Sequence, residues 1–152
     1  DTEIGIKAIQ LLEKLGYEVI IPEHIESGRA WLSKGLIRKG KEIANKNIAL
    51  LHSLITAETP LIGIEPSAIL TFRDEYPDLA SDELSEKAKA LSKNVFLIDE
   101  FIAAEIEKGN ISKEKFPTHL LLIPDGNGRW AKLAHKNITE GHKKGAEVIK
   151  NI

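Results

Sequence analysis

The stretch that decides the fold is "PLIGIEPSAILTFRDEY", residues 60–76. Its first part, "PLIGI" (60–64), is a short apolar run of the kind that forms a buried strand. The polar turn 65–67 then leads into a segment that we expect to be a short helix. That helix is expected to end at Pro77, because a proline disfavours helical geometry in the residue before it. A strand, a turn and a helix in this order are typical of α/β proteins.

Helices and strands alternate along the rest of the chain. Apolar residues at helical spacing predict helices, and short β-prone runs predict strands. Ser81 and Thr139 are expected to cap helix starts. Gly16 and Gly109 are expected to end helices. The predicted helices cover 4–15, 36–54, 81–91, 99–108, 128–135 and 140–151, and the predicted strands cover 17–21, 60–64, 94–98 and 118–123, with 94–98 also compatible with the start of the next helix.

Strands that alternate with helices imply right-handed crossovers and parallel pairing. We therefore expect a three-layer α/β fold with a short, mainly parallel sheet flanked by helices, forming a single domain over residues 1–152. Ligands bind beyond the carboxyl ends of the strands in such sheets. The candidate ends in this sequence are 22–29, 65–67 and 125–129.

Composition narrows the class of function. With 42% hydrophobic and 29% charged residues, the 152-residue chain is typical of a globular domain that can bury a core. Its net charge of -2 gives no basic excess, so no nucleic-acid partner is expected. The apolar runs are too short to span a bilayer and no signal peptide is evident, so we expect no membrane span and a cytoplasmic location.

The chain contains no cysteine, which excludes disulfides, thiolate metal sites and cysteine catalysis. Its five histidines show none of the paired spacings of a zinc site. The lysines near the C-terminus could attract a phosphate or RNA, but they are more typical of a solvated helix face.

Two segments, "ESGRAWLSKGLIRKGKEIANKN" (26–47) and "PLIGIEPSAILTFRDEYPDL" (60–79), carry a family resemblance. Over about residues 1–116 the chain resembles the cysteine-rich (CCG-type) domain of iron–sulfur oxidoreductases linked to FAD oxidases of the lactate/glycolate kind. The resemblance implies cluster-binding cysteines at the positions of Glu26, Ser27 and Ala68. These residues supply no thiolate, so we expect the fold but no iron–sulfur cluster.

The same region has a structural and a functional interpretation. Gly28 and Gly35 are expected to serve turn geometry. Arg29 and Arg73 are expected to form ion pairs, with partners among Glu65, Asp74 and Glu75. Alternatively, Arg29 and Ser67 line a secondary anion pocket left over from the family's site.

The second motif, "PDGNGRWAK" (124–132), has the chemistry of an anion site. Glycines let the backbone approach a phosphate, and N–H groups at a helix start point toward it. Arg129 offers a forked pair of donors to phosphate oxygens. Taken alone, Asp-Gly and Asn-Gly are also common turn dipeptides.

With "EGHKKGAE" (140–147), this motif resembles the opening segment of cis-prenyltransferases, the undecaprenyl diphosphate synthase family, over residues 117–152. The resemblance implies that Asp125 is the catalytic residue, engaging magnesium and assisting the departure of diphosphate. It implies that Trp130 helps to shape the site. Ile138 stands where the family often has an arginine. The residues implied to bind the diphosphate are Gly126, Asn127, Gly128, Arg129 and His142.

The two resemblances meet near 116–117. We therefore interpret the chain as a composite or designed α/β domain without demonstrated catalysis, carrying a strand-loop-helix that binds an isoprenyl diphosphate or another phosphate anion, with magnesium as the candidate cofactor. A natural fusion and a misassembled sequence stay open. One alternative function is that of a cis-prenyltransferase fragment, which would transfer an isoprenyl diphosphate. The other is that of a degenerate subunit or domain of a flavin/iron–sulfur oxidoreductase. The sequence predicts no oligomeric state.

Overall fold

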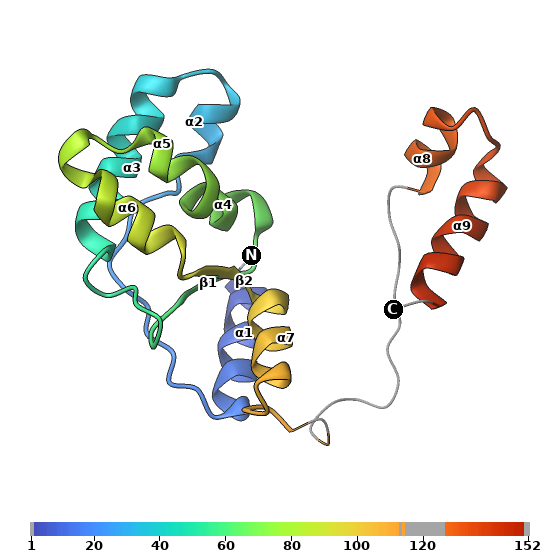
Figure 1. Cartoon of the computed structure of the whole chain (residues 1–152), viewed down its shortest axis with the longest axis horizontal. Helices are drawn as coiled ribbons and strands as arrows, with labels where there is room; N and C mark the ends of the chain where they lie inside the picture. Colours follow the sequence, from blue (N-terminus) through green and yellow to red (C-terminus); the bar gives the residue numbers. More distant parts are fainter. Residues whose placement is uncertain (1, 113, 115–126, 151–152) are drawn as a thin grey trace. The chain divides into compact units, whose positions relative to one another are not determined.

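The computed structural model describes residues 2–112, 114 and 127–150. The chain divides into two compact units, Asp1–Glu114 and Lys115–Ile152, which are described separately below (Figure 1). The division falls beside the family junction predicted at 116–117. The expectation of a single domain over residues 1–152 stays a prediction.

Unit 1 is a small α/β fold with a short parallel sheet. In its described residues, strand β1 (Leu61–Gly63) pairs with β2 (Val95–Leu97), and Leu61 lies opposite Val95. The predicted α/β class and the parallel pairing are therefore confirmed. The crossover between the strands contains α4 (Pro66–Leu70), the π-helical turn η1 (Thr71–Glu75), α5 (Tyr76–Leu79), the 3-10 turn η2 (Asp82–Leu84) and α6 (Ser85–Ser92). The other helices of unit 1 are α1 (Thr2–Leu15), α2 (Arg29–Ser33), α3 (Ile37–Leu51) and α7 (Ile98–Glu107).

The strand predicted at 17–21 is wrong. This segment is irregular, and Ile20 and Ile21 are 63% and 72% exposed. Strand propensity depends on a pairing edge and a surface to bury, and these two isoleucines find neither within unit 1. The strand predicted at 118–123 lies outside the described residues.

The helix that follows β1 does not end at Pro77, in contrast to the prediction. Pro77 lies in the first turn of α5, and the helix continues to Leu79. The turn η1 explains this, because Tyr76 N–H donates to Thr71 O, one residue further back than in an α-helix. This wider turn relieves the clash that a proline ring makes with the carbonyl four residues earlier.

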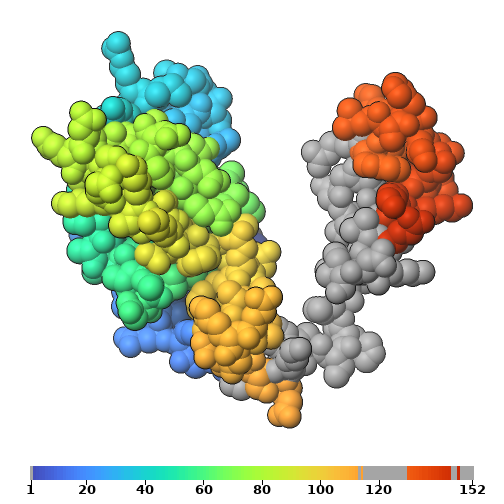
Figure 2. All heavy atoms as spheres, viewed as in Figure 1, coloured from blue at the N-terminus to red at the C-terminus, as the bar shows by residue number. Residues whose placement is uncertain are grey.

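The core of unit 1 lies between α3, the α4–η1–α5 segment, α6 and β2. Gly63 allows β1 to pack closely on α4, since a Cβ atom at this position would lie 2.3 Å from Cβ of Ile69. Ile37 is an apolar residue of the predicted helix 36–54, but at the first position of α3 it is 54% exposed. On the face that Figure 2 shows, side chains fill the spaces between the ribbons of this unit. The core residues are Ala44, Ile48, Leu51, Ile55, Ile69, Phe72, Tyr76, Ala88, Leu91 and Val95.

A buried carboxylate joins the ends of α1 and α7. Tyr17 Oη donates to Glu105 Oε2 at 2.8 Å, and the Tyr17 ring packs edge-on against Phe101. Glu105 is 7% exposed and also accepts hydrogen bonds from Lys108 and Asn110, both at 2.8 Å. These bonds, with that from Lys108 first, lower the pKa of Glu105 to about 2. Burial and the bond to Glu105 raise the pKa of Tyr17 to about 12.

Gly16 and Gly109 end helices, as predicted. Gly16 has φ +101°, its N–H donates to Glu13 O, and Tyr17 N–H donates to Leu12 O. This pair of bonds is the Schellman pattern that glycine favours, since it avoids the steric penalty of a left-handed residue. Gly109 ends α7 in the same way, with φ +78°.

Unit 2 contains α8 (Asn127–Leu133) and α9 (Ile138–Lys150), as predicted. Its small residues Ala131 and Gly141 are buried. In the described part of the chain, no helix combines the length and the apolar character needed to cross a membrane.

Thr139 is not the N-cap of α9, so this prediction is wrong. Asn137 caps the helix: its Oδ1 accepts from Glu140 N–H at 2.9 Å, and its own N–H donates to Glu140 Oε2 at 3.3 Å. A reciprocal capping box needs an acid three residues after the cap. Glu140 meets this requirement for Asn137, whereas a cap at Thr139 would place His142 there.

The first prediction concerns the carboxylate that joins α1 and α7. Glu105→Ala should lower the free energy of unfolding of unit 1 by about 2 kcal/mol, because it leaves the Tyr17 hydroxyl and the Asn110 amide without their acceptor. Since the pKa of Glu105 is lowered in the folded state, its contribution is present above the ordinary carboxyl pKa and is lost as pH falls toward about 2. Urea unfolding between pH 3 and pH 7 measures both effects. The matched control is Glu107→Ala, an exposed acid of the same helix. Equal stabilities of the two variants at pH 7 would contradict the role of Glu105.

Candidate functional site

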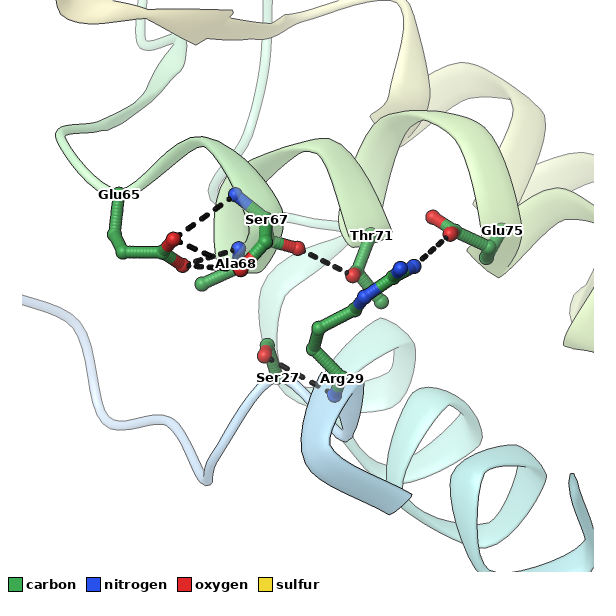
Figure 3. Close-up of polar contacts among 7 residues, drawn as sticks. All are labelled: Ser27, Arg29, Glu65, Ser67, Ala68, Thr71 and Glu75. Carbon is green, nitrogen blue, oxygen red and sulfur yellow. Dashed lines mark hydrogen bonds and ion pairs between the residues drawn. The ribbon is translucent and has the colours of Figure 1, made fainter. Parts of the chain in front are cut away.

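Two segments that are distant in the sequence, the turn 26–29 and the helix that begins at Pro66, face each other in unit 1 (Figure 3). Tyr76 Oη donates to Ser27 O at 3.1 Å, and the Arg29 guanidinium donates to the carboxylate of Glu75. The two segments that carry the oxidoreductase resemblance, 26–47 and 60–79, are therefore in contact in the fold.

The side-chain amide of Asn47, on α3, is hydrogen-bonded to the turn. Its Oδ1 accepts from Ile25 N–H at 3.1 Å, and its Nδ2 donates to Glu26 O at 3.0 Å and to Tyr76 Oη at 2.8 Å. Asn47 and Tyr76 are both 0% exposed. Burial raises the pKa of Tyr76 to about 12, so its hydroxyl stays protonated and donates to Ser27 O at neutral pH. We call these four hydrogen bonds the turn clasp.

Gly28 brings the turn against α3. Its φ of +80° favours glycine, and a Cβ atom at this position would lie 3.2 Å from Cγ2 of Ile43. Gly35, with φ +73°, ends the short helix α2. The predicted turn roles of both glycines are confirmed.

The predicted ion pairs form with two of the three predicted acids. Arg29 pairs with Glu75, and their side chains are 41% and 36% exposed. Arg73 lies 3.4 Å from Asp74 and 2.8 Å from Glu100. Sequence reasoning missed Glu100, because it follows 27 residues later on α7 and meets Arg73 only through the tertiary fold.

The third acid, Glu65, caps α4 instead. Its carboxylate accepts from Ala68 N–H at 2.6 Å, from Ser67 N–H at 3.2 Å and from Ser67 Oγ at 2.8 Å. The bond from the Ser67 hydroxyl, followed by that from the Ala68 amide, lowers the pKa of Glu65, and the charge of Arg29 adds to this. An external anion would therefore compete with Glu65 for Ser67 and with Glu75 for Arg29. The anion pocket at Arg29 and Ser67 stays a prediction.

The residues that match the family's cysteines do not fit an iron–sulfur cluster. The Glu26 carboxylate accepts from Trp31 Nε1 at 2.8 Å, and Ser27 Oγ accepts from Arg29 N–H at 3.3 Å. Ala68 contributes only a methyl group. Iron–sulfur clusters are held by thiolates, and the chain has none.

A pocket of about 300 Å³ adjoins the Arg29–Glu75 pair. Its walls combine apolar side chains with three charged ones. The pocket joins α2, the start of α3 and α5, and sequence reasoning missed it. Its lining residues are Arg29, Leu32, Ser33, Ile37, Glu75, Asp78 and Leu79.

Sequence reasoning also missed Asn47, although a signal was present. Asn47 follows Ile43 and Ala44 and precedes Ile48 on the apolar face of α3, and all four residues are buried. A polar side chain on the buried face of an amphipathic helix must find hydrogen-bond partners, so its position marks a tether or a site.

The second candidate site lies in unit 2. Asp125 and Gly126 are outside the described residues. Asn127, Gly128 and Arg129 form the first turn of α8.

His142, the other predicted ligand of this site, is exposed on α9 next to the buried Gly141. Across the described residues, no three His, Asp or Glu side chains are grouped to hold a metal ion.

A hollow of about 370 Å³ borders Trp130. Trp130 is 39% exposed, and the ammonium of Lys136 lies 5.8 Å from the centre of the Trp130 ring. Lysines outnumber carboxylates around this hollow, and one of the carboxylates, Glu140, belongs to the capping box of α9. The lining residues are Trp130, Lys136, Glu140, Lys143, Lys144 and Glu147.

Comparison with known proteins identifies partial homologues of two kinds. D-2-hydroxyglutarate dehydrogenase of Escherichia coli is 25% identical over 139 residues, which cover 86% of this chain and 13% of that protein. Isoprenyl transferase of Helicobacter hepaticus is 50% identical over 40 residues, 26% of this chain and 17% of that protein. The (2E,6E)-farnesyl-diphosphate specific ditrans,polycis-undecaprenyl-diphosphate synthase of Lactiplantibacillus plantarum is 45% identical over 42 residues, 28% of this chain and 16% of that protein. No protein-family model matches the chain, and no solved structure matches it.

These relatives confirm both predicted resemblances and are consistent with a composite chain. The dehydrogenase match covers 86% of the chain, so wherever it starts it extends past residue 117. The junction is therefore not a sharp end of the oxidoreductase-like similarity. The chain spans less than a fifth of the length of each of these relatives.

The second prediction concerns the Arg29–Glu75 ion pair. Because both side chains are more than a third exposed, a double-mutant cycle with Arg29→Met and Glu75→Gln should give a coupling energy below about 1 kcal/mol. The coupling should fall further in 1 M salt, which screens exposed charges. Urea unfolding of the four proteins measures it. A coupling above about 2 kcal/mol would show that the pair acts as a buried one.

Proposed function

From these two partial homologies we propose that the chain is a binding domain, without catalysis of its own, for a diphosphate-bearing ligand of the isoprenyl diphosphate class. The ligand is taken up in unit 2 by Asp125–Arg129 and His142. One observation carries the proposal: Asp-Gly-Asn-Gly-Arg-Trp (125–130) is followed by Gly141-His142, in a chain with relatives 45–50% identical that are named for isoprenyl or undecaprenyl diphosphate chemistry.

Each residue of the motif has a role in this proposal. Gly126 and Gly128 let the backbone approach the phosphate oxygens, and the first N–H groups of α8 point toward an anion. Arg129 donates to two oxygens of the diphosphate. Asp125 offers the carboxylate that magnesium prefers, and the ion, when bound, offsets the charge of the diphosphate.

The described part of unit 2 supports an anionic ligand in two ways. Lys136, Lys143 and Lys144 line the hollow beside Trp130 with two glutamates, one of them paired with Lys144, so the local charge has one positive charge in excess and favours a phosphate. The partly exposed Trp130 ring offers an apolar face to an attached hydrocarbon chain.

We propose binding rather than transfer because Ile138 stands where the cis-prenyltransferase family often has an arginine. The alternative, a cis-prenyltransferase fragment, predicts product formation when isopentenyl diphosphate is added to the same assay.

The similarity over 86% of the chain favours a second candidate function, that of a degenerate domain of an oxidoreductase. In this function unit 1 supplies a scaffold that has lost its redox centre. A redox-active version would absorb visible light after incubation with ferrous iron and sulfide. The carboxylate, hydroxyl and methyl groups at the three matching positions argue against that outcome.

The third prediction tests the diphosphate site. In a Trp31→Phe background, the fluorescence of Trp130 should change on titration with farnesyl diphosphate and magnesium. Arg129→Ala should weaken this binding about tenfold or more, because it removes charge-assisted hydrogen bonds to the diphosphate. Lys132→Ala, which removes an exposed cation from the same helix, is the matched control and should change the affinity by less than about threefold.

Further ligands separate the parts of the proposal. Pyrophosphate should bind through the same residues, whereas farnesol should not. Asp125→Ala should abolish the magnesium dependence and leave weak, magnesium-independent binding. If wild type and Arg129→Ala respond equally to farnesyl diphosphate, the proposed site is refuted.

A further inference from the structure

We propose that the turn clasp is the device that fixes the turn 26–29 against the helix beginning at Pro66, and that unit 1 therefore folds and keeps this turn in place with no iron bound. The proposal concerns a different unit from the diphosphate site and does not depend on it. It assigns to a side chain, Asn47, the cross-link for which the resembling family uses cysteine thiolates and metal.

The geometry of the clasp is complete. The Asn47 amide uses its oxygen for Ile25 N–H and both of its amide hydrogens, one for Glu26 O and one for Tyr76 Oη. The Tyr76 hydroxyl in turn donates a hydrogen bond to Ser27 O. The clasp thus holds three consecutive residues, Ile25 to Ser27, by their backbone groups alone, so it does not depend on their side chains.

Burial of the two side chains that make the clasp makes it costly to break. Asn47 and Tyr76 are 0% exposed, so a lost partner would leave the buried amide or the buried hydroxyl unsatisfied. The Arg29–Glu75 pair joins the same two segments, but water can replace its partners because both side chains are more than a third exposed. We therefore assign the fixing of the turn to the clasp and not to the ion pair.

Packing supports the same assignment. A Cβ atom on Gly40 would lie 2.3 Å from Cδ2 of Leu32, and one on Gly28 would lie 3.2 Å from Ile43. The turn and α2 therefore rest directly on α3, the helix that carries Asn47. A metal cluster between the turn and α4 is not required for this contact.

The donor set at the matching positions is consistent with the loss of the cluster. Glu26 and Ser27 are engaged with Trp31 and with the Arg29 amide, and Ala68 offers no donor atom. Without the clasp, the turn would be held by the packing of Gly28 on Ile43 and by an exposed ion pair.

The test compares two asparagines of α3. Asn47→Ala removes three bonds of the clasp. Asn45→Ala removes three bonds of the same kind, to Lys41 O, Leu79 O and Ser81 N–H, which lie away from the turn.

In a Trp130→Phe background, Trp31 reports on the turn through its bond to Glu26. Hydrogen exchange of the amides at 25–29 is the second measurement. Asn47→Ala should raise the exchange rates at 25–29 about tenfold or more and shift the Trp31 emission to the red. Asn45→Ala should change these rates by less than about twofold. Should Asn47→Ala fail to fold, Tyr76→Phe removes only the hydroxyl and should loosen the same amides.

The test of iron binding uses the full chain, which is prepared with a chelator and then incubated with ferrous iron and sulfide. No visible absorbance and no change in Tm are expected, because nothing in the native state binds the cluster. Visible absorbance together with a higher Tm would overturn the proposal. So would unchanged exchange at 25–29 in both Asn47→Ala and Tyr76→Phe.

Discussion

The hydrogen bonds of one buried amide organise unit 1. Asn47 lies on the apolar face of α3, where leaving its polar atoms unpaired would cost more than a typical surface interaction returns. Its partners are backbone groups of the turn and the hydroxyl of Tyr76, so α3, the turn and the helix after β1 must come together at one point. The positions of Arg29 and Glu75 follow from that meeting, and so does the pocket beside them.

The two units differ in how their charged groups are paired. In unit 1 the charged groups at the site are satisfied by neighbours: Arg29 by Glu75, and Glu65 by the start of α4. An anion at this site would have to displace those partners. In unit 2 the hollow beside Trp130 is lined by three lysines and two glutamates, and one of the glutamates pairs with Lys144. The one positive charge in excess favours an anion there.

Local signals in the sequence predicted much of the fold. Helical spacing located α1 and α3, glycines located two helix ends, and the apolar runs at 60–64 and 94–98 located the two strands of the described residues. The failures involve residues whose state depends on distant partners. "YEVII" (17–21) has strand propensity but no edge to pair with in unit 1. Arg73 meets Glu100 only after folding. Asn47 was visible as a polar residue on an apolar stripe, but its partners could not be read from spacing.

The turn η1 sets which face the helix after β1 presents to α3. A π-helical turn holds one residue more than the α-helical turn it replaces, and successive residues of an α-helix differ by about 100° around the axis. If residues 71–75 closed into regular α geometry with no residue lost, everything after them would turn by that angle. Tyr76 would then face away from Asn47, and Pro77 would meet the carbonyl that the wide turn now keeps clear. A chain that lost one residue of η1 as the turn closed would keep Tyr76 on its present face, so the facing of Tyr76 depends on the number of residues and the width of the turn together.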